Sequence, residues 1–376
     1  MIKNTSGEKQ LDKQQPELLQ NFWYAVEASP QVTQKPTKLT LMGKDYVLYR
    51  DSKGKAIALD NQCPHRGASL SLGWTDGDCL RCPYHGWKFE SGGSCSHIPA
   101  DAPGTRIPAR AKVTSYPVQE RYGIVWLFVG DLTLPPAQRP SLPEFPQFDN
   151  PERPPTYSEF TFDGNYTRCI EILMDASHPP FVHKGALGKP KDASKVQVNR
   201  YAVEETEWGF NARMDVKVNR LNGINKFIFD QDDPDAYKTY AFGLPNLNHT
   251  SIKFGKLQLE SLMFSVPVSE NKTVVKAVNL RGFMNNIPLV SDFLDYHVAR
   301  IGNKILAEDE IIVRQQTPQP VPYQNSRSEL LVASDATMMT YRKLLRKYSQ
   351  KKAFPEGLAA GDRQDSENIR LTGIPS

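Results

Sequence analysis

The stretch CPHRGASLSLGWTDGDCLRCPYHGW, residues 63–87, decides how the first half of this 376-residue chain is organised. It contains Cys63-Pro-His65 and Cys82-Pro-Tyr-His85, with sixteen residues between His65 and Cys82. A proline follows each cysteine and a glycine follows each motif, so two turn-forming loops each offer one thiol and one imidazole. Thiolates and imidazoles at such short spacing are typical metal ligands. The stretch therefore predicts a metal centre held between two loops.

Two kinds of centre suit two cysteines and two histidines. One is a structural zinc ion, and the other is a Rieske [2Fe–2S] cluster, in which two histidines replace two cysteines on one iron. Zinc loops usually pair like with like, whereas each loop here mixes one Cys with one His, as a two-iron cluster requires, so we favour the cluster. Cys79 forms a rival C-x-x-C with Cys82, but no proline follows it, and we expect a half-buried strand thiol.

Charge and hydropathy exclude several kinds of partner. The 46 basic and 42 acidic residues leave a net charge of +4, too small for the concentrated basic surface that nucleic acids require. The apolar run Ile124–Val129 is far shorter than the roughly eighteen residues that cross a bilayer. The first twenty residues contain no apolar signal region. We therefore expect a cytoplasmic protein with a small-molecule partner, without nucleic acid and without a transmembrane segment.

Eight prolines between Pro135 and Pro155 mark a domain boundary, because proline disrupts helices and central strands. Alternating apolar residues predict antiparallel strands on both sides of it. Helices are expected around 170–177, around 291–316 and after Ser334-Asp335, a good N-cap pair. The predicted division is a tail at 1–20, a β domain at 21–134, a Pro-rich linker at 135–155, a second domain at 156–349 and a polar tail at 350–376.

A second group of potential ligands opens the second domain, where MDASHPPFVH contains Asp175, His178 and His183. Taken alone, these could equally be a helix-end acid and two loop histidines. The Pro179-Pro180 step is expected to end the helix just after His178 and to let His183 fold back, so that both imidazoles face one metal. A non-haem Fe(II) oxygenase site needs one carboxylate in addition.

The first of the two C-terminal helices offers this carboxylate. Its apolar stripe is expected to consist of Val298, Ile301, Ile305, Asp309 and Ile312, at steps of three or four residues. This phase buries Asp309, puts Glu308 at the edge of the stripe and directs Glu310 away. Because a buried carboxylate is unfavourable unless it is paired or metal-bound, Asp309 is the predicted third ligand. An ion pair with Arg300 or Arg314 is the alternative.

Together, CPHRG, CPYHGW, MDASHPPFVH and AEDEIIVRQQ make the chain resemble the oxygenase (alpha) component of Rieske non-haem iron oxygenases, over roughly residues 20 to 348. Within that family it is similar to the single-chain monooxygenase-like branch of pheophorbide a oxygenase, aromatic O-demethylases and cyanobacterial saxitoxin-pathway hydroxylases. The resemblance implies a homotrimer and an α+β fold. An N-terminal antiparallel β domain would hold the Rieske [2Fe–2S] cluster, and a helix-grip (Bet v1/START-like) catalytic domain would follow.

The resemblance also implies the role of each candidate residue. Asp175 would be a catalytic residue that connects a cluster histidine of a neighbouring subunit to an iron-binding histidine. The chain departs from the family at Ile172, where members often have Asn, so polar support from that position is in doubt. The implied ligands are Cys63 and Cys82 on one cluster iron, His65 and His85 on the other, and His178, His183 and Asp309 on a mononuclear Fe(II).

The implied function is that of an oxidoreductase, a monooxygenase or dioxygenase. It would use O2 and external electrons to hydroxylate, or oxidatively dealkylate, a small organic substrate of secondary or pigment metabolism. The chain has no G-x-G-x-x-G and no other nicotinamide or flavin signature, so a ferredoxin and/or an NAD(P)H-dependent flavin reductase must supply electrons. The alternative is a Rieske ferredoxin-like electron carrier with an appended binding domain, which would not need His178, His183 and Asp309.

Overall fold

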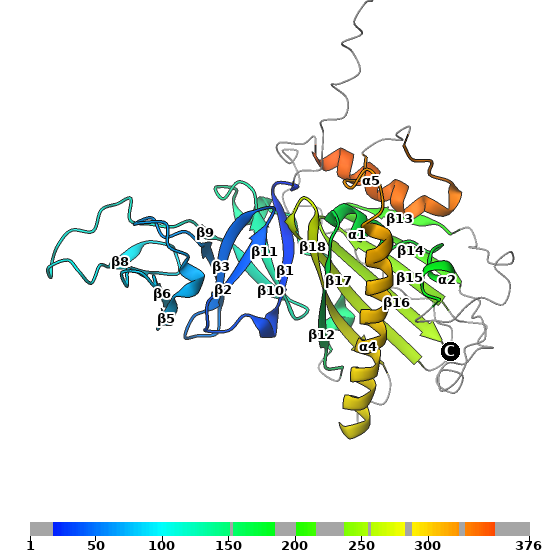
Figure 1. The fold of residues 1–376 in the computed structure, drawn as a ribbon, viewed down its shortest axis with the longest axis horizontal. Helices are drawn as coiled ribbons and strands as arrows, with labels where there is room; N and C mark the ends of the chain where they lie inside the picture. Colours follow the sequence, from blue (N-terminus) through cyan, green and yellow to red (C-terminus); the bar gives the residue numbers. More distant parts are fainter. Residues whose placement is uncertain are drawn as a thin grey trace, which may run out of the picture.

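The computed structural model describes residues 18–150, 153–184, 201–215, 237–254, 257–282, 288–322 and 328–349. The strands in this part of the chain form four antiparallel sheets, three of them in the N-terminal half (Figure 1). The predicted tails lie outside the described residues, apart from residues 18–20. Mostly antiparallel sheets with few helices confirm the predicted α+β fold class.

The N-terminal half contains a three-stranded sheet and two four-stranded sheets, and the strand orders are β1-β11-β10, β2-β3-β4-β9 and β5-β6-β7-β8. Most neighbouring strands follow one another along the chain, as short Gly- and Asp-containing turns allow, whereas β1 pairs with β11 and β4 with β9 across long stretches of sequence. The strands are β1 (Phe22–Ala28), β2 (Thr37–Leu41), β3 (Lys44–Arg50), β4 (Ala56–Asp60), β5 (Trp74–Asp76), β6 (Cys79–Arg81), β7 (Lys88–Phe89), β8 (Cys95–His97), β9 (Ser115–Tyr116), β10 (Val118–Arg121) and β11 (Ile124–Val129).

The sheet β2-β3-β4-β9 separates two hydrophobic cores. Successive residues of a strand point to opposite faces. On β3, Tyr46 and Leu48 pack into the core shared with β1 and β11, whereas Val47 and Tyr49 pack into a smaller core. This smaller core also contains the thiols of both Cys/His loops. The two loops are therefore attached to their own compact core at one end of the molecule.

The C-terminal half is built on one seven-stranded sheet of order β12-β18-β17-β16-β15-β14-β13. In Figure 1 the long helix α4 crosses this sheet, and α1 and α5 lie near it. This arrangement of a long helix on an antiparallel sheet is the one expected of a helix-grip domain. The strands are β12 (Thr156–Phe162), β13 (Val203–Thr206), β14 (Gly209–Asp215), β15 (Tyr237–Gly243), β16 (Leu247–Phe254), β17 (Leu257–Ser269) and β18 (Lys272–Arg281).

Three of the helices correspond to the predicted ones, with shifted ends. α1 (Tyr166–Leu173) begins four residues earlier than predicted, because Asn165 caps it by accepting the backbone N–H of Thr167 at 3.0 Å. α4 (Pro288–Val313) also begins and ends earlier, and α5 (Ala336–Ser349) follows Asp335 as predicted. No helix among the described residues combines the length and hydrophobicity that a membrane span needs.

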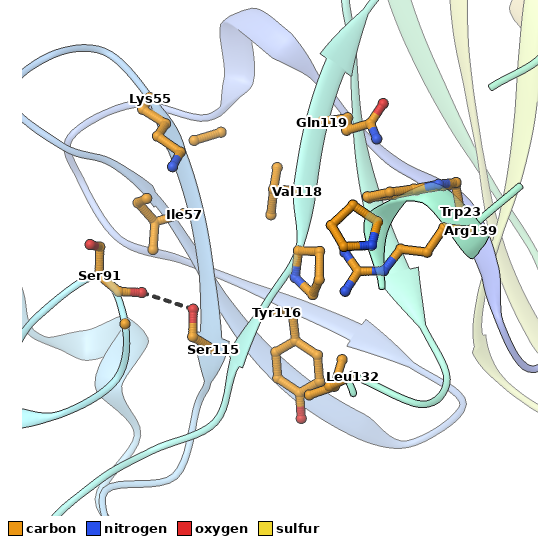
Figure 2. A pocket seen from close by; sticks show the side chains of 14 residues that line it. Trp23, Lys55, Ile57, Ser91, Ser115, Tyr116, Val118, Gln119, Leu132 and Arg139 are labelled. Carbon is orange, nitrogen blue, oxygen red and sulfur yellow. Dashed lines mark hydrogen bonds between the residues drawn. The ribbon is translucent and has the colours of Figure 1, made fainter. Parts of the chain in front are cut away.

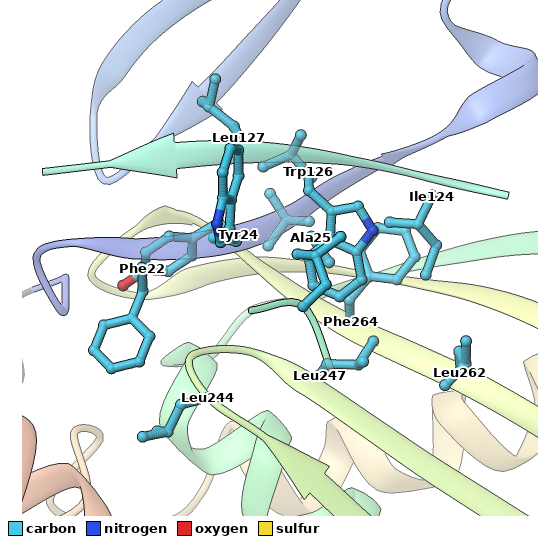
Figure 3. Close-up of a cluster of buried hydrophobic side chains, with 14 of the residues drawn as sticks. Phe22, Tyr24, Ala25, Ile124, Trp126, Leu127, Leu244, Leu247, Leu262 and Phe264 are labelled. Carbon is cyan, nitrogen blue, oxygen red and sulfur yellow. The ribbon is translucent and has the colours of Figure 1, made fainter. Parts of the chain in front are cut away.

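The two halves pack through one continuous hydrophobic core. Figure 3 shows Tyr24 and Trp126 of the N-terminal half close to Leu247 and Phe264 of the seven-stranded sheet. All four side chains are at most 1% exposed. Burial of aromatic side chains of this size is among the largest stabilising terms in a core. The Pro-rich segment between the halves therefore connects two parts that are in direct contact.

Asn246 adds a polar contact at this junction. It is fully buried in the turn between β15 and β16 and accepts the backbone N–H of Ala25 at 3.1 Å. Its side-chain amide donates to the carbonyls of Ala25, at 2.8 Å, and Ser265, at 3.1 Å. One side chain thus pairs the backbone of β1, next to its irregularity between Ala25 and Glu27, with the seven-stranded sheet.

We predict that Asn246→Ala lowers the free energy of unfolding by about 2–4 kcal/mol, because it removes three hydrogen bonds and leaves buried backbone groups of Ala25 unpaired. Asn211→Ala, at an exposed position of β14, is the matched control and should change stability by less than about 0.5 kcal/mol. Urea denaturation measures both. Equal stability of the two variants would contradict the role assigned to Asn246.

Candidate metal centres

The two Cys/His loops have the same backbone geometry. In each, the cysteine N–H donates to the carbonyl five residues later, and the cysteine carbonyl accepts the N–H of the glycine four residues later. Each glycine has a positive φ, 75° for Gly67 and 68° for Gly86, which suits a residue without a Cβ. The four bonds are Cys63 N to Ala68 O at 2.9 Å, Gly67 N to Cys63 O at 2.9 Å, Cys82 N to Trp87 O at 2.9 Å and Gly86 N to Cys82 O at 3.0 Å.

The loops bury their thiols and expose their imidazoles. Cys63 and Cys82 are 2% and 1% exposed, whereas His65 and His85 lie at the surface with ring centroids 4.6 Å apart. Burial raises the pKa of the Cys63 thiol, and the neighbouring Cys82 raises it further. A buried thiolate pair therefore needs bound cations. Cys79, on β6, is half-buried as predicted.

The four loop donors do not meet at one point. Among the residues that the structure describes, the only group of three or more Cys, His, Asp or Glu side chains placed to hold one metal ion lies elsewhere in the chain. A single tetrahedral ion needs all four donors close to one centre. Two buried sulfur atoms beside two exposed imidazoles instead suit two metal ions side by side. The loops thus fit a two-iron cluster better than zinc.

That one compact group consists of His178, His183 and Asp309. The two Nε2 atoms are 3.0 Å apart, and each lies 3.3 Å from Oδ1 of Asp309. Asp309 is 3% exposed, and its Oδ1 accepts no hydrogen bond. Two ring nitrogens and a carboxylate oxygen thus converge on one point. A metal cation would satisfy all three, so this donor set fits a mononuclear iron site.

A second carboxylate faces the other nitrogen of each imidazole. Asp175 Oδ2 lies 3.5 Å from Nδ1 of His178, and Glu308 Oε2 lies 3.2 Å from Nδ1 of His183. The hydrogen bond with Glu308 holds the proton of His183 on Nδ1, which leaves the lone pair of its Nε2 for a metal. Asp175 lies within ion-pair distance of His178, whose Nδ1 forms no hydrogen bond with the described residues. Sequence reasoning missed Glu308 in this role. Its position next to Asp309 on one helix was the available signal.

The two imidazoles differ in their proton affinity. Burial lowers the pKa of His183, which favours the neutral form that binds metal. Burial also acts against the charged form of His178, but Asp175 and Asp309 raise the pKa of His178 above its usual value. A bound cation would displace a proton from between His178 and Asp309, so metal affinity is expected to fall as pH falls.

The backbone around the histidines differs from the prediction. α1 ends at Leu173, and the Pro179-Pro180 step begins the short helix α2 (Pro179–Val182) instead of ending a helix. Proline is favoured in the first helical turn, where no N–H partner is needed. The N–H of His183 donates to Pro179 O at 3.1 Å. His183 therefore returns towards His178 as expected, but through a helical turn.

The helical phase of α4 was predicted only in part. Asp309 is buried as expected, together with Leu306 and Val313, but Ile312 is 39% exposed, so the predicted stripe is wrong at that end. The alternative of an ion pair between Asp309 and Arg300 or Arg314 is also wrong, because the ion-pair contacts of Asp309 among the described residues are with His178 and His183.

A surface pocket of about 520 Å³ is lined by none of these donors (Figure 2). It is lined by residues of β4, β9 and β10 and by the start of the Pro-rich segment, including Tyr116 and Arg139. Arg139 is already engaged, since it donates to Leu134 O at 3.1 Å and lies over the ring of Phe128. The pocket contains none of the candidate ligands, so we assign it no part in the chemistry.

Comparison with known proteins agrees with this geometry. Residues 22–117 match the Rieske [2Fe-2S] domain family, and residues 162–350 match the vanillate O-demethylase oxygenase C-terminal domain. The chain belongs to the Rieske non-haem iron oxygenases. It is therefore an oxidoreductase that uses O2, with a [2Fe–2S] cluster and a mononuclear iron as cofactors. The appended oxygenase domain argues against the electron-carrier alternative.

Several Rieske oxygenases are similar to it. The iron-sulfur subunit TsaM1 of the toluene-4-sulfonate monooxygenase system of Comamonas testosteroni is 32% identical over 61% of this chain and 65% of its own length. Methylxanthine N1-demethylase NdmA of Pseudomonas putida is 28% identical over 92% of both chains. The structure of NdmA with caffeine has a TM-score of 0.72 at 22% identity, over 87% of this chain and 90% of that one.

We predict that Glu308→Gln weakens Fe(II) binding by about ten- to a hundredfold, because His183 loses its orienting carboxylate. Asp309→Ala should abolish binding at this site and leave the visible spectrum of the cluster unchanged. Glu310→Gln is the matched control on the same helix and should bind Fe(II) normally. Anaerobic titration of iron-depleted protein measures all three, and normal affinity in Asp309→Ala would refute the site.

Proposed function

We propose that the two cofactors of this Rieske oxygenase are held by the residues that the sequence indicates. The convergence of two imidazoles and a buried carboxylate, each imidazole backed by a second carboxylate, is the observation that carries the mononuclear site. The buried thiols and exposed imidazoles support the cluster assignment. The proposed ligands are Cys63 and Cys82 on one cluster iron, His65 and His85 on the other, and His178, His183 and Asp309 on the mononuclear iron.

The substrate is a small organic molecule that is hydroxylated or oxidatively dealkylated. Iron at the second site supplies O2 activation, which consumes two electrons from outside the substrate. The protein's own part is to present three donors in fixed positions, with Glu308 keeping the proton of His183 on Nδ1 and Asp175 within ion-pair distance of Nδ1 of His178. The relatives named above act on a sulfonate and on methylxanthines, so similarity supports the reaction class and not one substrate.

An external electron-transfer component works with this oxygenase, as with its family. We infer that the component is a ferredoxin and/or an NAD(P)H-dependent flavin reductase, because the chain has no nucleotide-binding signature of its own. An electron donor would come nearest to the cluster at the exposed His65 and His85. The cytoplasmic location expected from the sequence stays a prediction.

The electron pathway is proposed to cross between subunits of a homotrimer. The sheet β5-β8, which carries the second Cys/His loop, and the helix α2 lie at opposite ends of the molecule in Figure 1. Within one chain the two centres are thus far apart. A ring in which each subunit both gives and receives electrons brings them together.

Exposed apolar side chains support such a contact. Leu72, Trp74 and Tyr84, next to or within the cluster loops, are 76%, 50% and 56% exposed. Phe181 of α2 and Ile311 of α4, beside the iron ligands, are 44% and 47% exposed. Large apolar side chains that gather at both centres are typical of an interface.

Asp175 is proposed to connect the two centres, from His178 to a cluster histidine of the next subunit, most simply His85. We predict that Asp175→Asn retains both metals and the oligomer but lowers turnover by about ten- to a hundredfold, because the carboxylate that holds His178 is lost while no ligand is removed. Metal analysis and single-turnover rates test this. Loss of iron with normal turnover per iron would contradict it.

Mixed oligomers test directly whether electrons pass from one subunit to the next. A His65→Cys chain and an Asp309→Ala chain, each inactive alone, should recover partial activity when co-assembled, because one supplies the iron and the other a working cluster. Asp309→Ala mixed with His65→Cys/Asp309→Ala is the control, since no iron site remains there. Without recovery in verified mixed oligomers, the electrons would have to travel within one chain.

A further inference from the structure

Lys238 is a cationic side chain on the face of the sheet that the helices cover. Alternate residues of a strand share a face, and Tyr240 and Phe242 follow Lys238 on β15. Phe242 packs against Tyr341 of α5, with ring centroids 4.9 Å apart. The ammonium of Lys238 lies over the ring of Tyr240, 4.5 Å from its centroid. Lys238 therefore points into the layer that also contains the iron-site donors.

Lys238 has no counter-ion in the part of the chain that the structure describes. Burial lowers the pKa of Lys238 to about 8, and the carboxylates of Asp309 and Asp175 act in the opposite direction. Both carboxylates are directed at imidazoles, so neither forms an ion pair with Lys238. Among the described residues, no carboxylate therefore contacts the Lys238 ammonium.

Lys276 of β18 is, by contrast, a lysine with two counter-ions. It is also partly buried, but it contacts Glu27 and Glu159, each at 2.7 Å. These carboxylates raise the pKa of Lys276 despite its burial. A lysine held without any such partner is unfavourable unless something else supplies the negative charge.

Two unpaired polar atoms of β16 lie on the same face of the sheet as Lys238, Thr250 diagonally next to it and Asn248 further along the strand. Thr250 is directly opposite Tyr240 on β16 and is 8% exposed, and its Oγ1 has no hydrogen-bond partner. Asn248, two residues earlier on the same face, is 1% exposed, and its Oδ1 is unpaired while its amide donates to Ile170 O at 3.4 Å. Buried polar atoms are rarely left unpaired, so these atoms point to a ligand.

We propose that Lys238 binds the anionic group of the substrate, so that this oxygenase acts on a small organic acid, a carboxylate or a sulfonate. Thr250 donates a second hydrogen bond to the same anionic group. The reacting carbon then lies on the side of the molecule that faces His178, His183 and Asp309. This inference rests on the proposed function, because it places the substrate next to the proposed iron site.

The test compares acids with neutral analogues of the same shape. The probes are 4-methoxybenzoate and toluene-4-sulfonate, each matched with its amide, and binding to the holoenzyme is measured by calorimetry. The wild type should bind each acid at least tenfold more tightly than its amide, since a desolvated ion pair is the stronger contact. Equal binding of acid and amide, or no binding of either acid at millimolar concentration, would overturn the proposal.

Variants then assign the effect to one side chain. Lys238→Met should lose the preference for acids, whereas Lys238→Arg should keep it. Lys253→Met is the matched control, because Lys253 also lies over a tyrosine ring of β15, that of Tyr237, but on the opposite face of the sheet. Cluster absorbance and thermal unfolding establish that the variants fold. A Lys238→Met protein that still prefers acids would refute the assignment.

The iron content of the wild type separates this inference from the proposed function. A protein that lacks mononuclear iron but prefers acids through Lys238 would refute the proposed iron site and leave the anion site standing. A protein with a full iron site that binds acids and amides equally would refute the anion site and leave the proposed iron site standing.

Discussion

A buried arrangement of two guanidinium groups and two carboxylates holds the catalytic half together. Glu171 of α1 accepts from Arg168 at 3.0 Å and from Arg342 of α5 at 2.6 Å, and both arginines also contact Glu329. Burial raises the pKa of Glu171, while the guanidinium groups act to lower it. Loss of one partner would leave the others charged and buried, which costs about 3–5 kcal/mol. The junction of α1 with α5 therefore tolerates little change.

The same arrangement fixes the position of α1 relative to α4, and the iron-site donors come from the segment after α1 and from α4. Arg168 donates to the carbonyls of Pro318 and Gln319, at 3.1 Å and 3.2 Å, just beyond α4. The Gln319 side chain accepts from the N–H of Asn165 at 3.0 Å and donates to Val313 O at 2.9 Å. The start of α1 is thereby tied to the end of α4. Since the two histidines follow α1 and the carboxylate belongs to α4, their convergence depends on this tie.

Residue type and spacing were sufficient to single out the loop cysteines and histidines and the three donors that converge, because ligand chemistry restricts which side chains can serve. The local backbone conformation was harder to predict from the sequence. The role of Pro179 depended on whether the turn before it was helical, and the exposure of Ile312 depended on what packs against α4. The position of Glu308 beside Asp309 was not sufficient to assign its role, because that role depends on a contact with His183, 125 positions away in the chain. The surroundings of Lys238 depend on how β15 pairs with β16.

The continuous core between the N-terminal strands and the catalytic sheet limits how such proteins can be recombined. A cut in the Pro-rich segment would separate Trp126 from Phe264 and leave both apolar surfaces in water. The smaller core behind β3 and β4, which includes Cys63 and Cys82, contains no described residue of the catalytic half. An exchange of redox modules between relatives would therefore succeed at the sheet β2-β3-β4-β9, with β1 and β11 kept beside the catalytic sheet that they cover.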